Sequence, residues 1–348
     1  MMSTVVPSTI AHSPTVGVDG LDAIMRRGGR ELRERMARAE LHLEQVTAQA
    51  GAPLASLANA TIVAGGKRLR PLLVVLAAQS AGGPEHTGEG EERLLRAAVA
   101  VELVHSATLV HDDLIDGAQL RRGHPTVAAA AGRGLAIATG DLLFSRAFAE
   151  LARNEDAEQL RALSQASSAL AAGELLQRED AYASQVAVER YLRRCELKTA
   201  ALFEAACRLG ALTAVRGSNV LAEALGTFAR RIGLAFQMLD DVLDVSGPVE
   251  RTGKSRGRDL LDGTVTLPLI LAREREEELA AFDLRTLECP QQADALCERI
   301  TATGALDEAR ERALAVVAEA KAALAAILPD GRSVLLDMVA DAVVERYR

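Results

Sequence analysis

The chain has 348 residues, of which 49% are hydrophobic and only 3% aromatic, and this length allows one large domain or two of ordinary size. Ala, Leu and Val must form most of the core, and a mixture rich in Ala and Leu favours helices. The formal net charge of -8 argues against nucleic acid as a partner, because proteins that bind its phosphates usually present a basic face.

The first residues, MMSTVVPSTIAHSPTVGV, contain neither a basic start nor a continuous apolar segment, so they do not fit a signal peptide. We expect residues 1–18 to be a disordered leader and residues 19–348 to form a single all-helical domain. The sequence contains no uncharged apolar run of about 18 residues, so we expect no membrane span. The cysteines, at positions 195, 207, 289 and 297, lack the close spacing of a zinc or redox site. These features predict a cytoplasmic protein with buried free thiols.

A helical repeat of apolar residues extends through nearly the whole chain from about residue 19. It begins with LRERMARAELHLEQV and continues in RLRPLLVVLAAQSAGG, where Pro71 suits a first helical turn and a glycine pair ends the helix. PLLVVLAAQ is the nearest candidate for a strand, but its helical flanks favour a helix. Further helices are predicted over residues 92–116, 133–153, 156–182, 186–210, 216–245, 264–277, 291–303, 305–327 and 331–346.

Two of these helices, 92–116 and 216–245, are apolar on nearly all faces, so we expect them at the centre of the protein. Both end in the pattern Asp-Asp-x-x-Asp, first in LVHDDLID and then in QMLDDVLDVSG. The pattern places the carboxylates of positions i and i+4 on one helix face, beside apolar surface and at the negative end of the helix dipole. The residues are Asp112, Asp113, Asp116, Asp240, Asp241 and Asp244.

Hard divalent cations resolve this repulsion, because Mg²⁺ takes oxygen ligands and commonly sits between carboxylates and substrate phosphates. A single such pattern in an acidic protein is more often a solvated face. Two copies, each at the end of an apolar helix and each followed by a glycine-rich basic loop, favour a metal site instead.

Basic residues accompany both acidic patterns. GGKRLRP places Lys67, Arg68 and Arg70 at a predicted helix start, where backbone amides and cations suit an anion. Arg121 and Arg122 follow Asp116 closely, and Lys254 follows the second pattern in TGKSRGRDL. His105 lies two turns before Asp112 on nearly the same face, which fits either a core histidine or an anion contact.

Together these segments resemble the trans-isoprenyl (polyprenyl) diphosphate synthases of medium and long product chain. The matching segments occur in the family's order between about residues 50 and 275: GGKRLRP, VELVHSATLVHDDLIDGAQLRRGHPT, GELLQ, LKTAALFEAACRLGA, FQMLDDVLDVSG and GKSRGRDLLDGTVTLPLI. The resemblance implies an all-α bundle of about 10–13 helices around a deep central cavity, usually a homodimer, that uses several Mg²⁺ ions.

The resemblance also implies roles for single residues. Asp112, Asp116 and Asp240 are expected to bind Mg²⁺ directly, with Asp113, Asp241 and Asp244 assisting. The allylic diphosphate is expected to contact Arg121, Lys198, Thr199, Gln237 and Lys254, and isopentenyl diphosphate to contact Lys67, Arg70, His105 and Arg122. Of these, Asp112, Asp116, Asp240, Lys198 and Arg121 are the expected catalytic residues.

Two positions bear on details of the reaction. Many family members have lysine where this chain has Thr264, so one cationic contact to the allylic diphosphate is missing. The fifth and fourth residues before Asp112 are Ala107 and Thr108, where short-chain enzymes often have an aromatic floor. Small residues there predict a product longer than farnesyl (C15), with geranylgeranyl (C20) as the shorter alternative.

Two other functions compete with this prediction. A class I terpene cyclase shares the helical fold and an Asp-rich pattern, but its second metal motif normally mixes Asn, Ser or Thr with Glu. A non-catalytic subunit of a heteromeric synthase is the other alternative. Such subunits tend to lose the acidic patterns, and this chain keeps both.

Overall fold

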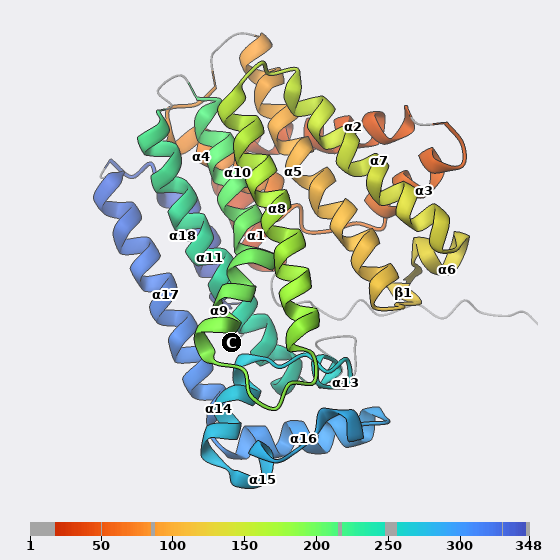
Figure 1. Ribbon diagram of the computed structural model, residues 1–348. Helices are drawn as coiled ribbons and strands as arrows, with labels where there is room; N and C mark the ends of the chain where they lie inside the picture. Colours follow the sequence, from red (N-terminus) through yellow and green to blue (C-terminus); the bar gives the residue numbers. More distant parts are fainter. Residues whose placement is uncertain are drawn as a thin grey trace, which may run out of the picture.

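The computed structural model describes residues 18–49, 51–84, 88–214, 218–247, 256–328 and 330–345. Helices dominate these residues, as the sequence predicts, and they form a bundle (Figure 1). The longer α-helices are α1 (Val18–Arg27), α2 (Gly29–Ala48), α3 (Leu54–Val63), α4 (Leu69–Ser80), α5 (Gly88–Ile115), α7 (Arg133–Ala152), α8 (Ala157–Asp180), α9 (Val188–Cys195), α10 (Ala201–Leu212), α11 (Asn219–Ser246), α14 (Leu267–Arg275), α16 (Pro290–Ala302), α17 (Ala305–Ile327) and α18 (Val334–Glu345).

Short elements connect them. The described part of the chain contains 17 α-helices, more than the 10–13 expected, because brief helices occupy several connections. In Figure 1 the helices α13 to α16 lie together at the lower end of the bundle. The short elements are α6 (Val127–Ala131), α13 (Arg258–Leu261), α15 (Glu277–Ala280), the 3₁₀ turn Leu284–Thr286 and two strands, β1 (Leu120–Arg121) and β2 (His124–Pro125).

Helices α5 and α11 occupy the core, as their apolar surfaces predict. Buried residues lie on every side of α5, and α11 packs against both α10 and α17. By length and composition α5 is apolar enough to cross a membrane, but 78% of its most apolar window is buried inside this protein. That burial is typical of the core helix of a folded domain.

The ends of α5 and α11 follow local sequence signals. Gly117 adopts a φ of +63° just beyond α5, the left-handed conformation that glycine favours after a helix. At the start of α11, Ser218 accepts a hydrogen bond from the amide of Leu221, as an N-cap residue does. The acidic patterns lie at the C-terminal ends of both helices, as predicted, since α5 ends at Ile115 and α11 ends at Ser246.

The helix predicted over 186–210 extends without a break from Val188 to Leu212, but it is not α-helical throughout. Helix α9 ends at Cys195, a π-helical turn spans Glu196–Ala200, and α10 begins at Ala201. Neighbouring helices approach this turn closely: a side chain at Gly173 would lie 2.6 Å from the Lys198 amide, and one at Gly233 would lie 2.8 Å from the Cα of Ala200. Helices α8 and α11 thus enclose the turn, and π-turns often mark functional sites.

The loop after α5 contains a small amount of strand, which the sequence did not indicate. Leu120 pairs with Pro125, and Arg121 pairs with His124, in an antiparallel hairpin. Arg122, at its tip, has a φ of +52°. Because Arg121 and Arg122 occupy successive positions of this hairpin, their side chains start in different directions.

The cysteines agree with the sequence analysis. All four are free, and three of them, Cys195, Cys207 and Cys297, are buried. Cys289 is half-buried.

Candidate active site

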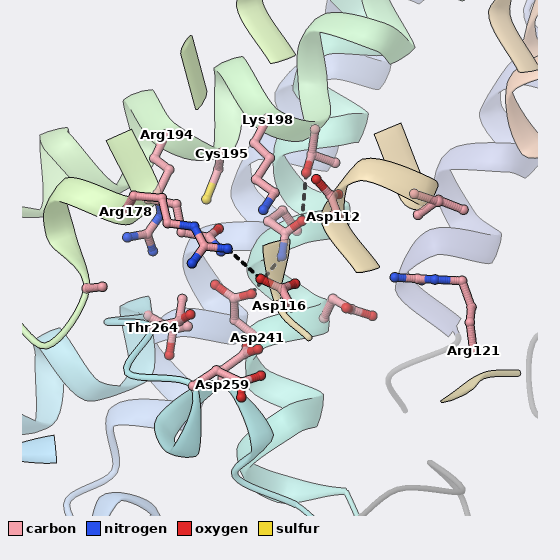
Figure 2. Close-up of a pocket in the computed structure, with 18 residues that line it drawn as sticks. Asp112, Asp116, Arg121, Arg178, Arg194, Cys195, Lys198, Asp241, Asp259 and Thr264 are labelled. Carbon is pink, nitrogen blue, oxygen red and sulfur yellow. Dashed lines mark hydrogen bonds and ion pairs between the residues drawn. The ribbon is translucent and has the colours of Figure 1, made fainter. Parts of the chain in front are cut away.

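A polar cavity of about 370 Å³ opens where α5, α8 and α11 meet the π-turn and the segment 256–266. Figure 2 shows acidic groups on one side of this cavity and basic groups facing them. Most of its lining is polar or charged. The lining residues are Leu109, Asp112, Asp116, Arg121, Gln177, Arg178, Ala181, Arg194, Cys195, Lys198, Thr199, Gln237, Asp240, Asp241, Asp259, Asp262, Thr264 and Thr266.

The acidic end of α5 divides its carboxylates between two environments. Asp112 and Asp116 line the cavity, as their spacing of four residues predicts. Asp113 is buried elsewhere and accepts hydrogen bonds from Arg121 Nε at 2.9 and 2.8 Å, with Nη2 at 2.7 Å. This ion pair fixes the hairpin to α5, so both Asp113 and Arg121 have a structural role in the free protein.

Asp112 is a cavity carboxylate without a hydrogen-bond donor among the described residues. Burial raises its pKa from 3.8 to about 6. Lys198 lowers that pKa and Glu174 raises it, both through charge. A desolvated carboxylate without a donor favours an added cation.

Asp116 belongs to a chain of ion pairs that joins the end of α5 to α8 and the π-turn. Arg178 Nη2 lies 2.7 Å from Asp116 Oδ1, and Arg178 Nε lies 3.0 Å from Glu174 Oε1. Glu174 also accepts a hydrogen bond from the Lys198 ammonium. Burial alone would raise the pKa of Glu174, but the two neighbouring cations bring it below its usual value.

The second acidic pattern is held by a buried hydrogen-bond network. Asp240 and Asp241 line the cavity. Asp241 accepts hydrogen bonds from the Tyr191 hydroxyl at 2.7 Å and from Gln237 Nε2 at 2.8 Å, while Thr199 Oγ1 donates to Gln237 Oε1 at 2.7 Å. Burial raises the pKa of Asp241, although both donors act in the opposite direction. The network links α9, the π-turn and α11.

Replacing Tyr191 with phenylalanine is expected to lower the free energy of unfolding by about 1–3 kcal/mol, because a buried carboxylate loses one of its two donors. Tyr191 is fully buried, so water cannot take the place of the lost hydroxyl without rearrangement. Urea denaturation measures the change. Tyr182→Phe is the matched control, because that half-buried tyrosine donates no hydrogen bond from its hydroxyl among the described residues. Equal stability of the two variants would contradict the prediction.

Asp244 and the segment beyond α11 form a further acidic group that includes two residues the sequence analysis missed. Asp244 Oδ2 accepts from the amide of Asp259 at 3.1 Å, which brings Asp259 beside the second acidic pattern. Burial and then its acidic neighbours raise the pKa of Asp259 well above its usual value. Asp259 and Asp262 line the cavity with Thr264. They stand in the matched segment GKSRGRDLLDGT, but that match alone did not single them out.

A second basic cluster surrounds His105, which lies two helical turns before Asp112 on α5. Burial, followed by the charges of Arg70, Arg122, Arg121 and Arg68, lowers the pKa of His105 well below its usual value. Arg70 stacks on the Phe203 ring at 5.0 Å, and its buried Nε has no hydrogen-bond partner among the described residues. Neutral His105 with these cations suits an anionic ligand.

Arg68 differs from its neighbours in GGKRLRP. Its guanidinium contacts Glu40 at 2.7 and 2.6 Å, Glu102 at 3.1 Å and the carbonyl of Ile62 at 2.8 Å. Arg68 therefore joins α2, α3 and α5, whereas Lys67 is exposed and lies three residues before Arg70 in the chain.

The remaining predicted residues have different positions. Thr108 is partly accessible and donates to the carbonyl of His105 at 2.8 Å, whereas Ala107 is fully buried. Neither lines the polar cavity. Lys254 lies outside the described residues.

Comparisons with known proteins agree on one family. Residues 52–300 match the family model described as polyprenyl synthetase. A geranylgeranyl diphosphate synthase of Methanosarcina mazei is 38% identical over 81% of this chain and 86% of its own. A heptaprenyl diphosphate synthase component 2 of Geobacillus stearothermophilus is 39% identical over 72% of this chain and 76% of its own.

A solved structure agrees over nearly the full length. The polyprenyl synthase of Caulobacter crescentus, in complex with calcium and isoprenyl diphosphate, superposes with a TM-score of 0.84. It is 34% identical, and the match covers 97% of this chain and 100% of that chain.

Proposed function

This chain belongs to the polyprenyl synthetase family and is a trans-prenyl diphosphate synthase, and from this we infer how its two charged regions divide the substrates. The polar cavity binds the diphosphate of an allylic substrate, through Arg121, Lys198, Thr199 and Gln237. The basic cluster of Lys67, Arg70, His105 and Arg122 binds isopentenyl diphosphate. The observation that carries this proposal is the meeting of both acidic helix ends in one cavity.

The acidic residues of the cavity fit Mg²⁺. Asp112, Asp116 and Asp240 would hold the metal, and Asp241 would assist, because the donors are all carboxylate oxygens, which hard cations prefer. Asp112 also has no hydrogen-bond donor among the described residues. In the described ranges no three acidic, cysteine or histidine side chains form a closed metal cage. Mg²⁺ would therefore need diphosphate oxygens and water as further ligands, which is its usual behaviour.

The chemistry follows from the charges. Bound Mg²⁺ supplies Lewis-acid neutralisation of the negative charge that grows on the departing diphosphate. Lys198 and Arg121, which both line the cavity, add positive charge, and electrostatic stabilisation of this kind is the largest contribution in many enzymes. The carbon–oxygen bond breaks, and the resulting allylic cation is attacked by the double bond of isopentenyl diphosphate.

The step closes with loss of a proton. A new carbon–carbon bond forms, the cationic product loses a proton to the released diphosphate, and a new double bond restores an allylic diphosphate. No protein nucleophile is required. The product is longer by one five-carbon unit and has the same reactive end, so the cycle can repeat.

The product is longer than farnesyl (C15). Thr108 and Ala107 place no aromatic side chain one turn before Asp112, so the growing chain has room along α5. Geranylgeranyl (C20) is the shorter alternative among products beyond C15, and product sizing tests it. A class I terpene cyclase would have no use for the basic cluster around His105.

Incubation with Mg²⁺, isopentenyl diphosphate and labelled farnesyl diphosphate tests the proposal, with chromatographic sizing of the dephosphorylated product. We expect products beyond C15, and failure to extend the label would refute the long-chain proposal. Measuring diphosphate release by this protein alone separates a complete enzyme from a subunit that needs a partner.

We further propose that residues 19–348 act as one cytoplasmic domain that forms a homodimer, without nucleic acid or a membrane span. Large apolar side chains at Ile115, Leu120 and Ile137 are 46%, 61% and 41% exposed near the hairpin and α7, which suits a subunit contact. The leader, residues 1–18, lies almost wholly outside the described residues.

A further inference from the structure

Arg178, from α8, faces the polar cavity although the sequence analysis gave it no role. It follows directly on the segment GELLQ. Its side chain is 45% exposed, and Figure 2 shows the guanidinium directed at Asp116. Its two ion-pair partners are Asp116 and Glu174. The guanidinium therefore lies beside a carboxylate that we expect to bind metal.

The other cations of the cavity are occupied differently. Among the described residues that line it, four side chains carry a positive charge: Arg121, Arg178, Arg194 and Lys198. Arg121 is paired with buried Asp113 and stands apart in Figure 2. Arg194 is buried, donates to the carbonyl of Val265 at 2.6 Å and stacks on Tyr191 at 5.3 Å. Arg178 and Lys198 remain. Their hydrogen-bonded partners, Asp116 and Glu174, are partly exposed carboxylates.

Thr264 lines the same cavity as Arg178. Its amide donates to the carbonyl of Asp259 at 2.7 Å, which fixes the backbone, but its side chain brings no charge. The resemblance to the synthase family implies a lysine at this position in many members. In this chain the cavity lacks that cation and has Arg178 on the facing helix.

We propose that Arg178 binds the allylic diphosphate and supplies the positive charge that Thr264 does not. In the free protein Arg178 is paired with Asp116. When Asp116 binds metal, Arg178 exchanges this carboxylate for a diphosphate oxygen. The planar guanidinium suits this exchange, because it can donate two parallel hydrogen bonds to carboxylate or phosphate alike. This inference rests on the proposed function of the cavity.

The test uses full-length protein and measures binding without turnover. Calorimetry with farnesyl diphosphate and Mg²⁺, in the absence of isopentenyl diphosphate, gives the dissociation constant directly. Arg178→Gln is expected to raise it about 10- to 100-fold, the range for one charge-assisted contact. Arg178→Lys keeps the charge but loses the paired donors, so we expect a smaller rise.

Arg161→Gln is the matched control, because Arg161 is exposed on the same helix, pairs with Glu158 and does not line the cavity. We expect its dissociation constant to equal that of the wild type. The KM for isopentenyl diphosphate should stay unchanged in Arg178→Gln, since that substrate is assigned to the cluster around His105.

A second substitution distinguishes ligand binding from a purely structural role. The double variant R178Q/T264K places a lysine at position 264. Its dissociation constant for farnesyl diphosphate is expected to be at least threefold lower than that of R178Q. A structural contact between Arg178 and Asp116 would not be restored by a cation on another segment. Unchanged binding by R178Q, or no recovery in R178Q/T264K, overturns the proposal for Arg178. Wild-type protein that forms no product overturns the proposed function itself.

Discussion

Asp112→Asn is expected to lower kcat/KM by about 10³-fold, the upper range for removal of one group that stabilises developing charge. Asparagine keeps the size and one oxygen of the side chain but cannot supply the negative charge that holds a divalent cation. The loss should be accompanied by a higher Mg²⁺ requirement, measured as the Mg²⁺ concentration for half-maximal activity. Asp307→Asn, at an exposed position in the first turn of α17, is the control.

Stability should move in the opposite direction from activity. The pKa of Asp112 is raised to about 6 in the folded protein, from 3.8, so the folded state holds its proton more tightly than the unfolded state. The wild type therefore loses stability as pH rises from about 4 to 6 and remains penalised above it. Asparagine does not titrate. Thermal unfolding without metal should show Asp112→Asn equal to wild type near pH 4 and more stable at pH 7.

This pair of measurements separates a metal-binding role from a structural one. If the Asp112 carboxylate stabilised the fold, its replacement by asparagine would lower the unfolding temperature. An Asp112→Asn variant that is less stable at pH 7, yet retains wild-type kcat/KM, would contradict the role proposed for the end of α5.

The sequence predicts the central helices well because their signals are local. Apolar residues on all faces place α5 and α11 in the core, and Ser218 and Gly117 mark their ends. The π-turn could not be predicted in this way. It depends on the close approach of Gly173 on α8 and Gly233 on α11, two residues far from the turn in sequence, and a local helical pattern contains no information on that packing.

The site residues also divide into those that local sequence spacing predicts and those that depend on tertiary contacts. Helical spacing is sufficient to place Asp112 and Asp116 on one face, and the structure has both in the cavity. The partner of Asp113 is beyond such reasoning, because Arg121 reaches it only through the hairpin that follows α5. Arg178 was missed for a similar reason. Its position four residues after Glu174 is typical of an exposed helical ion pair, and only the fold brings Asp116 beside it.

Product length depends on which face of α5 borders the growing chain. At 100° per residue, Thr108 lies about 40° from Asp112 around the helix, whereas Ala107 lies about 140° away. The burial of both residues agrees, since Thr108 is partly accessible and Ala107 is fully buried. One helical turn is about 5.4 Å, so a side chain at Thr108 stands one turn below the reacting diphosphate.

Thr108→Phe is therefore expected to shorten the main product by at least one five-carbon unit, because the ring would occupy the path along α5. Ala107→Phe should shorten it less and lose about 1–3 kcal/mol in stability, since the added ring must enter a filled core. Thr301→Phe, on α16, is the control for adding an aromatic ring at an exposed helical threonine. Chromatography of the dephosphorylated products gives the lengths, and urea denaturation gives the stabilities. If Thr108→Phe and Thr301→Phe both make the wild-type product, the chain does not grow along this face of α5, and the floor of the cavity must be formed by another helix.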